Sequence, residues 1–192
     1  MSNDPKNLDR RQALTGVLAL GLSSPSWALE DSQTYGEDEM MKKAVGFFGK
    51  GAEGLAKVLE KVFKEKGRPN GYITGEEASA ALTVGLRYGE GRLTLKGGKS
   101  AKVYWAGPSI GIDAGANASK VFTLVYDLPK VADIYQRFGG VDGSLYWIGG
   151  VGVNYQNKDG ITLAPIRLGV GLRTGASVGY LHYRPKKSYN PL

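Results

Sequence analysis

The chain has 192 residues, a length typical of one domain, and a formal net charge of +7. It contains no cysteine, which excludes disulfides and thiolate metal sites. It also has a single histidine, so a zinc site or a Ser-His-Asp triad would need unusual partners. The 29 glycines are about twice the usual share of ~7%. Most lie between aromatic and β-branched residues, as in tightly packed, twisted sheets. The net charge favours anionic partners, although acidic side chains are interspersed with the basic ones.

Residues 1–28 predict a signal peptide that is removed on export. Arg10 and Arg11 provide a positive start, an apolar stretch follows, and Ser26 and Ala28 are the small residues that precede a cut after Ala28. The paired arginines also resemble a twin-arginine export motif, so the choice between that route and the Sec route stays open. The apolar stretch is shorter than the ~20 apolar residues that a membrane-spanning helix needs, and no later apolar segment reaches that length. We therefore expect a periplasmic protein without a transmembrane segment in its mature chain.

The mature chain is expected to begin with a flexible leader at residues 29–36 and to continue as one helix-plus-barrel domain over residues 37–192. Apolar residues recur at three- and four-residue spacing over residues 37–66, which predicts helical structure. Glycines between residues 46 and 54 weaken the middle of this stretch, so it is interpreted as two helices or one kinked helix.

A second, shorter helix is predicted near residues 75–81. After a turn at residues 67–71, Thr74 and Glu77 have the spacing of a capping box. In this interpretation Glu77 has no chemical role, because the positive end of a helix dipole explains a carboxylate at that position.

From Thr83 onward the apolar residues alternate, which predicts strands. The segment Gly89-Glu90-Gly91 predicts a turn between the first two. Residues 121–126 are apolar on both faces and predict a central buried strand. Residues 145–155 predict one long strand, and residues 157–160 predict the turn of a hairpin that leads into the last strands.

One short helix is expected to interrupt the strands, capped by Asp127 and extending to Phe138. The fold class is therefore α+β and mainly β. We expect a small antiparallel β-barrel or a strongly curled sheet of six or seven strands, with the N-terminal helices over one end or face. An outer-membrane barrel is disfavoured, because its strands need lipid-facing bands of about 9–11 residues and several strands here are shorter.

The sequence contains no evident catalytic set. His182 lies on the last predicted strand, where a structural role is the more common one. The carboxylates form no obvious pair. Asp113 interrupts a glycine-rich apolar segment and is kept as a candidate ligand-binding acid, although a loop or solvent-facing position is the more common explanation of such a residue. Glycine strings at residues 149–152 and 169–171 lie within predicted strands and lack the strand-to-helix context of a phosphate loop. Neither a metal site nor a cofactor is predicted.

Three arginines form the strongest candidate site. Arg167 and Arg173 share a strand face with intervening glycines, and Arg87 occupies a similar position in another strand. We expect this face to be solvent-exposed. Its two interpretations are an ordinary solvated surface whose glycines relieve twist, which is the more common case, and a site that binds a phosphate or carboxylate through forked hydrogen bonds. Arg167 and Arg173 should then be removable together without unfolding. Tyr104 and Trp105 are candidates for stacking on a ligand, although core packing is the more common use.

Four segments closely resemble the DUF1134 family: Gly67-Arg68-Pro69-Asn70-Gly71-Tyr72-Ile73, Gly85-Leu86-Arg87-Tyr88-Gly89, Tyr104-Trp105 followed by Gly107-Pro108-Ser109-Ile110-Gly111, and Leu163-Ala164-Pro165-Ile166-Arg167. The resemblance extends from about Tyr35 to Leu192. It implies a periplasmic protein with a small β-barrel and a role in envelope integrity, and it brings no known enzymatic activity or catalytic residues. The segment from Gly107 to Tyr155 is also similar, over part of the chain only, to the SYLF lipid-binding domain.

These observations favour a non-enzymatic periplasmic protein that supports envelope integrity by binding an envelope component: an anionic lipid, a glycan or an envelope protein. Nucleic acid is not an expected partner, and the oligomeric state is open. The first alternative is a lipid-binding module for anionic headgroups. The second is a hydrolase of cell-wall or lipid substrates, which would need two carboxylates that converge in a cleft.

Overall fold

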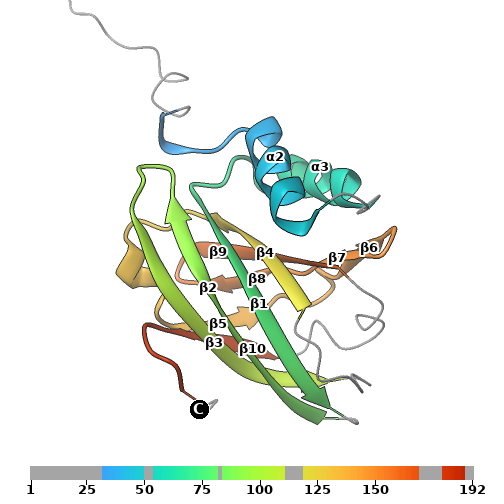
Figure 1. Cartoon of the computed structure of the whole chain (residues 1–192), viewed down its shortest axis with the longest axis vertical. Helices are drawn as coiled ribbons and strands as arrows, with labels where there is room; N and C mark the ends of the chain where they lie inside the picture. Colours follow the sequence, from blue (N-terminus) through green and yellow to red (C-terminus); the bar gives the residue numbers. More distant parts are fainter. Residues whose placement is uncertain (1–31, 50–53, 82–83, 111–118, 169–178, 189–192) are drawn as a thin grey trace, which may run out of the picture.

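The computed structural model describes residues 32–49, 54–81, 84–110, 119–168 and 179–188 (Figure 1). In these ranges the helices are α2 (Glu37–Phe48), α3 (Leu55–Lys66) and the short 3-10 helix η1 (Val131–Ile134). The strands are β1 (Gly71–Ala81), β2 (Val84–Leu95), β3 (Ser100–Ile110), β4 (Ser119–Tyr126), β5 (Arg137–Gly140), β6 (Tyr146–Ile148), β7 (Val151–Val153), β8 (Gln156–Lys158), β9 (Ile161–Leu168) and β10 (Tyr180–Arg184).

The two N-terminal helices form where the apolar spacing predicts them, as two separate elements. The buried side chains of α3 recur at three- and four-residue spacing: Leu55, Val58, Leu59 and Val62. Gly67 ends this helix with a φ of 74°, and its N–H donates to the carbonyl of Phe63 at 2.8 Å. Glycine suits this position because the left-handed conformation would strain a residue with a side chain.

The strands form one antiparallel sheet that closes on itself. The order is β4-β1-β2-β3-β10-β5-β8-β9, and β4 pairs with β9 to complete a ring of eight strands. Beyond the ring, β7 pairs with β9 and β6 pairs with β7. The prediction of a small antiparallel barrel is confirmed, but six or seven strands were too few. Strands β5 to β8 have only three or four residues each, too short to show a clear alternation.

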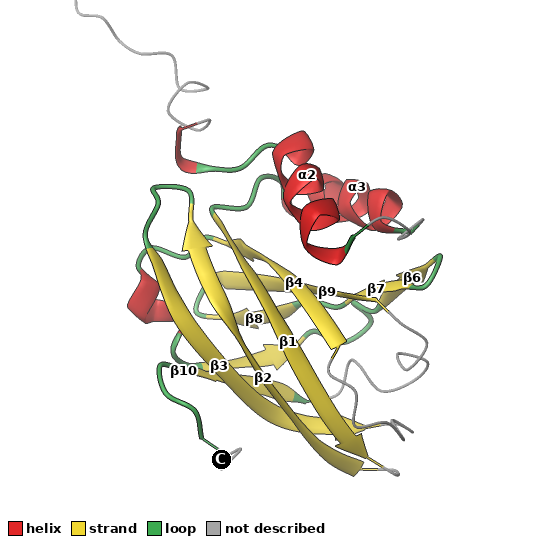
Figure 2. Cartoon of the chain, viewed as in Figure 1, coloured by secondary structure: helices red, strands yellow, loops and turns green. Residues whose placement is uncertain are grey.

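Both faces of the barrel wall are buried on one flank. Helices α2 and α3 lie over the outer face of β4, β9 and β7, where Phe122, Leu124 and Ile166 are buried in the same cluster as the helix side chains (Figures 1 and 2). A second cluster, which includes Ile73, Trp105, Val125, Leu163 and Tyr183, fills the interior. An eight-stranded barrel has an interior about wide enough for its own side chains. The segment 121–126, which is apolar on both faces, lies in β4 between these two cores, as predicted for a central buried strand.

Strand β1 occupies the segment for which a short helix was predicted. It pairs with β2 from Gly71 to Ala81 and with β4 from Gly71 to Glu77. Pairing along both edges outweighs the local capping-box signal of Thr74 and Glu77, so that prediction was wrong. As a consequence, Glu76 and Glu77 point to opposite faces of the wall, because side chains alternate along a strand.

The predicted turn at Gly89-Glu90-Gly91 is also wrong, because these residues lie inside β2. A Cβ at Gly89 would lie less than 3.0 Å from Cε2 of Trp105, and one at Gly75 would lie less than 3.0 Å from Cη2 of the same ring. The glycines therefore allow the indole to lie against the backbone of two neighbouring strands.

Two further differences concern the region after β4. The helix expected from Asp127 to Phe138 is reduced to η1, and Phe138 belongs to β5 with its side chain in the barrel interior. The single strand expected over residues 145–155 is a hairpin of β6 and β7, which turns at Gly149 and Gly150 with φ of 54° and 77°.

The hairpin predicted at residues 157–160 is confirmed between β8 and β9, where Asp159 and Gly160 both have positive φ. No helix in the described ranges is long and apolar enough to cross a membrane.

Candidate functional site

A network of charged side chains lies inside the barrel, among the apolar side chains of its core. Glu77 of β1 is 6% exposed and Arg167 of β9 is 3% exposed. Nε of Arg167 donates to Oε1 of Glu77 at 2.5 Å, and Nη2 donates to Oε2 at 3.3 Å. Nη1 of Arg167 donates to Oδ1 of the buried Asn154 at 2.9 Å. Arg167 is thus held by a forked contact to one carboxylate and one amide.

Arg87 and Trp105 contact the same carboxylate. Nε of Arg87 lies 3.5 Å from Oε1 of Glu77, and Nε1 of Trp105 donates to Oε2 at 3.2 Å. Arg87 is 8% exposed. We call Glu77, Arg87 and Arg167 the interior ion cluster. It contains two guanidinium groups and one carboxylate.

The interior ion cluster keeps Glu77 ionised. Burial by itself raises the pKa of this carboxyl, but the charges of Arg167 and Arg87 and the hydrogen bonds from Arg167 and Trp105 outweigh burial. The pKa falls from 4.5 to about 2. Each of these charges would be costly to bury in isolation, so the opposite charge beside it is what makes its burial tolerable.

The predicted arginine face is therefore not a solvent-exposed surface. Alternation along β9 does place Arg167 opposite the core residue Ile166, but both sides of β9 are buried: one under the helices and one in the barrel. The expected proximity of Arg87 to Arg167 is confirmed by their shared contact with Glu77. Arg173 and Asp113 lie outside the described residues.

A groove runs along the outer wall of β1, β2 and β3, on the part of the sheet that the helices leave uncovered. Its larger pocket has a volume of about 340 Å³ and is lined by Glu76, Glu77, Ala78, Tyr88, Gly89, Glu90, Tyr104, Trp105, Lys187 and Ser188. Tyr104, a predicted site residue, lies here half-buried, while Glu76 and Glu90 are exposed. Trp105 joins the groove to the interior ion cluster, because it lines the pocket and hydrogen-bonds Glu77.

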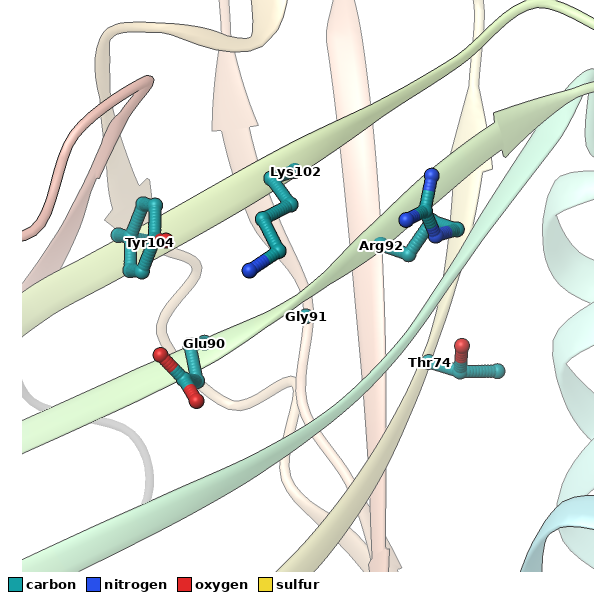
Figure 3. A pocket seen from close by; sticks show the side chains of 6 residues that line it. All are labelled: Thr74, Glu90, Gly91, Arg92, Lys102 and Tyr104. Atoms are coloured by element: carbon teal, nitrogen blue, oxygen red, sulfur yellow. The ribbon is translucent and has the colours of Figure 1, made fainter.

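The smaller pocket of the groove has a volume of about 240 Å³ and shares Glu90 and Tyr104 with the larger one. Figure 3 shows its side chains on three neighbouring strands: Thr74 on β1, Glu90 and Arg92 on β2, and Lys102 and Tyr104 on β3. We call the two pockets together the wall groove.

The single histidine lies on β10, beside cations. Nη2 of Arg184 lies 3.0 Å from Nδ1 of His182. Because a guanidinium can only donate, Nδ1 accepts, and the imidazole is neutral with its proton on Nε2. Burial and the charges of Arg184 and Arg137 lower the pKa of His182 below 6.5. In the described part of the chain no carboxylate forms an ion pair with His182, and no group of three or more metal-ligating side chains occurs.

The sequence interpretation gave no site role to several charged residues of these sites: Glu76, Glu77, Glu90, Arg92, Lys102 and Lys187. A signal existed for Glu77. If residues 71–81 are taken as a strand, alternation puts this carboxylate on the same face as Ile73 and Gly75, where a charge requires a buried partner. The site roles of the others depend on which segments of the chain are neighbours in space, which the spacing along the chain does not reveal.

Comparison with known proteins identifies the family. The model of the family "envelope integrity protein A" matches residues 33–192. A crystal structure of a β-barrel-like protein from Brucella abortus is 44% identical, with a TM-score of 0.77, and the match covers 83% of this chain and 99% of that one. No curated protein matches. The resemblance found in the sequence motifs is confirmed: this chain belongs to the envelope integrity protein A family.

Proposed function

We propose that this protein supports the integrity of the cell envelope from the periplasm by binding an envelope component in the wall groove, without catalysis. The family name supports a role in the envelope, and the N-terminal residues 1–28 support export. The barrel offers a rigid platform for such a site, because the ring of eight strands is closed.

The observation that carries this proposal is the larger pocket of the wall groove. Its volume of about 340 Å³ lies in the range of small-molecule sites. Tyr88 and Tyr104 supply aromatic surface, whereas Trp105 is buried in the barrel interior and does not present its ring for stacking; Glu90 and Lys187 supply hydrogen-bonding groups beside the tyrosines. Aromatic side chains combine apolar area with a polar edge, a combination that suits sugar rings and their hydroxyl groups. A glycan is therefore the envelope component that this pocket fits best.

The direct test is binding of the purified protein to glycans isolated from the envelope of its own host. Replacing Tyr104 with Ala should weaken binding at least tenfold and leave the melting temperature close to that of the parent. Trp147→Ala is the matched control, because Trp147 is 39% exposed on β6, which contributes no residue to the groove. Full binding by folded Tyr104→Ala, or no glycan binding by the parent protein, would refute the proposal.

A hydrolase is the second candidate, because two carboxylates do meet in the groove. Glu76 and Glu90 are directly opposite each other across β1 and β2, and both line the larger pocket. Glycoside hydrolysis needs one of its two carboxyl groups to stay protonated, which enzymes achieve by burial. Glu76 and Glu90 are both exposed, so binding is favoured. New reducing ends that appear with the parent protein and vanish with Glu76→Gln would establish hydrolysis instead.

An anionic lipid surface is the third candidate. The wall groove presents carboxylates next to its cations, so a flat, uniformly negative membrane would meet both attraction and repulsion there. Sedimentation with vesicles that contain anionic lipid separates the two ideas: binding to the vesicles that Tyr104→Ala does not change would favour the lipid module.

A further inference from the structure

Like charges face each other across the strands of the wall groove. Glu76 of β1 is the direct partner of Glu90 in β2, and Arg92 of β2 is the direct partner of Lys102 in β3. Directly opposed side chains in antiparallel strands have Cβ atoms about 4.5–5.5 Å apart, and like charges there destabilise the sheet. All four side chains are exposed. The groove thus has an acidic pair and a basic pair, neither of which stabilises the fold.

The cation that the strand pairing places opposite Glu76 forms no ion pair with the acidic pair. Lys120 of β4 is the direct partner of Glu76 on the other side of β1. Its ammonium group instead donates to the carbonyl of Phe47 in α2 at 2.9 Å and lies over the Phe47 ring. Tyr104 is the partner of Glu90 on the far side, and it is neutral. The two carboxylates therefore stand side by side, in a pocket that Lys187 also lines.

The basic pair has no acidic partner in its own row, where Thr74 is the direct partner of Arg92 on the β1 side. Among the described residues, no ion pair within 4.0 Å joins any two of the side chains of these two pairs, whereas Glu39 and Glu65 each pair with a lysine elsewhere. Glu90 and Arg92 are two residues apart on one strand, so the acidic and basic pairs are separated by about 7 Å.

We propose that the wall groove binds a zwitterionic saccharide, with its ammonium group at Glu76 and Glu90 and its phosphate or carboxylate at Arg92 and Lys102. This inference rests on the proposed function and narrows its ligand from a glycan to an amino sugar that carries an acidic group. The aromatic ring of Tyr104, which lines both pockets, lies beside the sugar that joins the two charges. The ammonium group of such a ligand neutralises the acidic pair and its anionic group neutralises the basic pair, so both groups contribute to the affinity in one binding event.

Isothermal titration with four sugars tests this assignment: glucose, glucosamine, glucose 6-phosphate and glucosamine 6-phosphate. Glucosamine 6-phosphate should bind at least tenfold more tightly than either singly charged sugar. Muramic acid, which has an amine and a carboxylate, distinguishes the two anionic groups, because its tighter or weaker binding shows which one the basic pair prefers.

Two double variants locate the charges. In Glu76→Gln with Glu90→Gln, the amine of the sugar should no longer increase the affinity, whereas the phosphate still should. In Arg92→Gln with Lys102→Gln, the phosphate should no longer increase the affinity, whereas the amine still should. Both variants lose like-charge repulsion, so neither should melt below the parent protein. Lys57→Gln with Lys64→Gln on α3 is the control for net charge, because these exposed lysines lie on the helix-covered side.

The outcomes separate this inference from the proposed function. Equal affinity for all four sugars, or failure of glucosamine 6-phosphate to bind, refutes the charge assignment. If the parent protein still binds envelope glycans in that case, the proposed function stands and only the zwitterionic ligand is wrong. If each double variant loses amine and phosphate recognition to the same extent, the charge assignment is also refuted, because the two charges of the ligand would then not be bound at separate places in the groove.

Discussion

Replacing Arg167 with Met should destabilise the barrel severely. The side chain is 3% exposed and makes two hydrogen bonds to Glu77 and one to Asn154. Methionine fills a similar space without the charge, so Glu77 would remain buried with Arg87 and Trp105 as its partners. We expect the free energy of unfolding to fall by about 3 kcal/mol at pH 7, within the ~3–5 kcal/mol typical of a broken buried ion pair.

The lowered pKa of Glu77 points in the same direction. Its fall from 4.5 to about 2 measures how much all partners of Glu77 favour the ionised form in the folded state. At about 1.4 kcal/mol for each pH unit, this amounts to roughly 3–4 kcal/mol, shared among Arg167, Arg87 and Trp105. A domain of this size has a total stability of only ~5–15 kcal/mol, so the loss is large.

The pH dependence follows from the direction of this pKa change. Because the folded state holds the lower pKa, the stabilisation is fully present above pH 4.5 and is lost as the pH falls towards about 2. Removing the Arg167 charge raises the pKa of Glu77 and shrinks this contribution. The stability difference between the parent protein and Arg167→Met should therefore narrow as the pH falls through that window.

Urea unfolding followed by tryptophan fluorescence measures both effects. Arg92→Met is the matched control: this exposed arginine should change stability by no more than about 0.5 kcal/mol. A loss of less than about 1 kcal/mol for Arg167→Met would mean that the pair contributes no more than a surface salt bridge. A difference that stays constant from neutral to acid pH would show that Glu77 is not the group involved.

Three further outcomes are expected. Gly89→Ala should lower stability by about 1–3 kcal/mol in thermal melts, because its Cβ would lie less than 3.0 Å from Trp105, whereas Gly97→Ala, with nothing within 4 Å, should be close to neutral; equal effects would contradict the close packing of the indole. His182 has a folded pKa below 6.5, so the parent protein should lose stability relative to His182→Gln as the pH falls below 6.5, and parallel pH profiles would argue against this. Protein recovered from the periplasm should begin after Ala28 on N-terminal sequencing, and an intact N-terminus there would refute export by cleavage at that site.

The sequence predicts best those elements whose pattern is local. The three- and four-residue spacing of Leu55, Val58, Leu59 and Val62 predicts α3, because a helix forms its hydrogen bonds within one segment. The run 121–126, apolar on both faces, predicts a central buried strand, and the turn residues before β9 predict its hairpin. The short motifs likewise predict the family, and the family match confirms it.

The functional geometry depends instead on contacts between distant segments. Glu77 and Arg167 belong to strands that are not neighbours in the chain, and they meet only because β4 pairs with both β1 and β9 to close the ring. A capping-box signal at Thr74 could not reveal this, since strand pairing is non-local and overrides weak local preference.

The charges of the wall groove also separate what the sequence determines from what only the tertiary structure determines. The sequence by itself determines that Glu76, Glu90, Arg92 and Lys102 are charged, but its capping-box signal places Glu76 in a helix and not in a strand. Only the register of β1 with β2, and of β2 with β3, places carboxylate opposite carboxylate and cation opposite cation. A shift of one residue would turn every side chain to the other face of the wall, because the strand period is two. The packing of Trp105 against Gly75 and Gly89 supports this register, and with it the arrangement of charge that a ligand would meet.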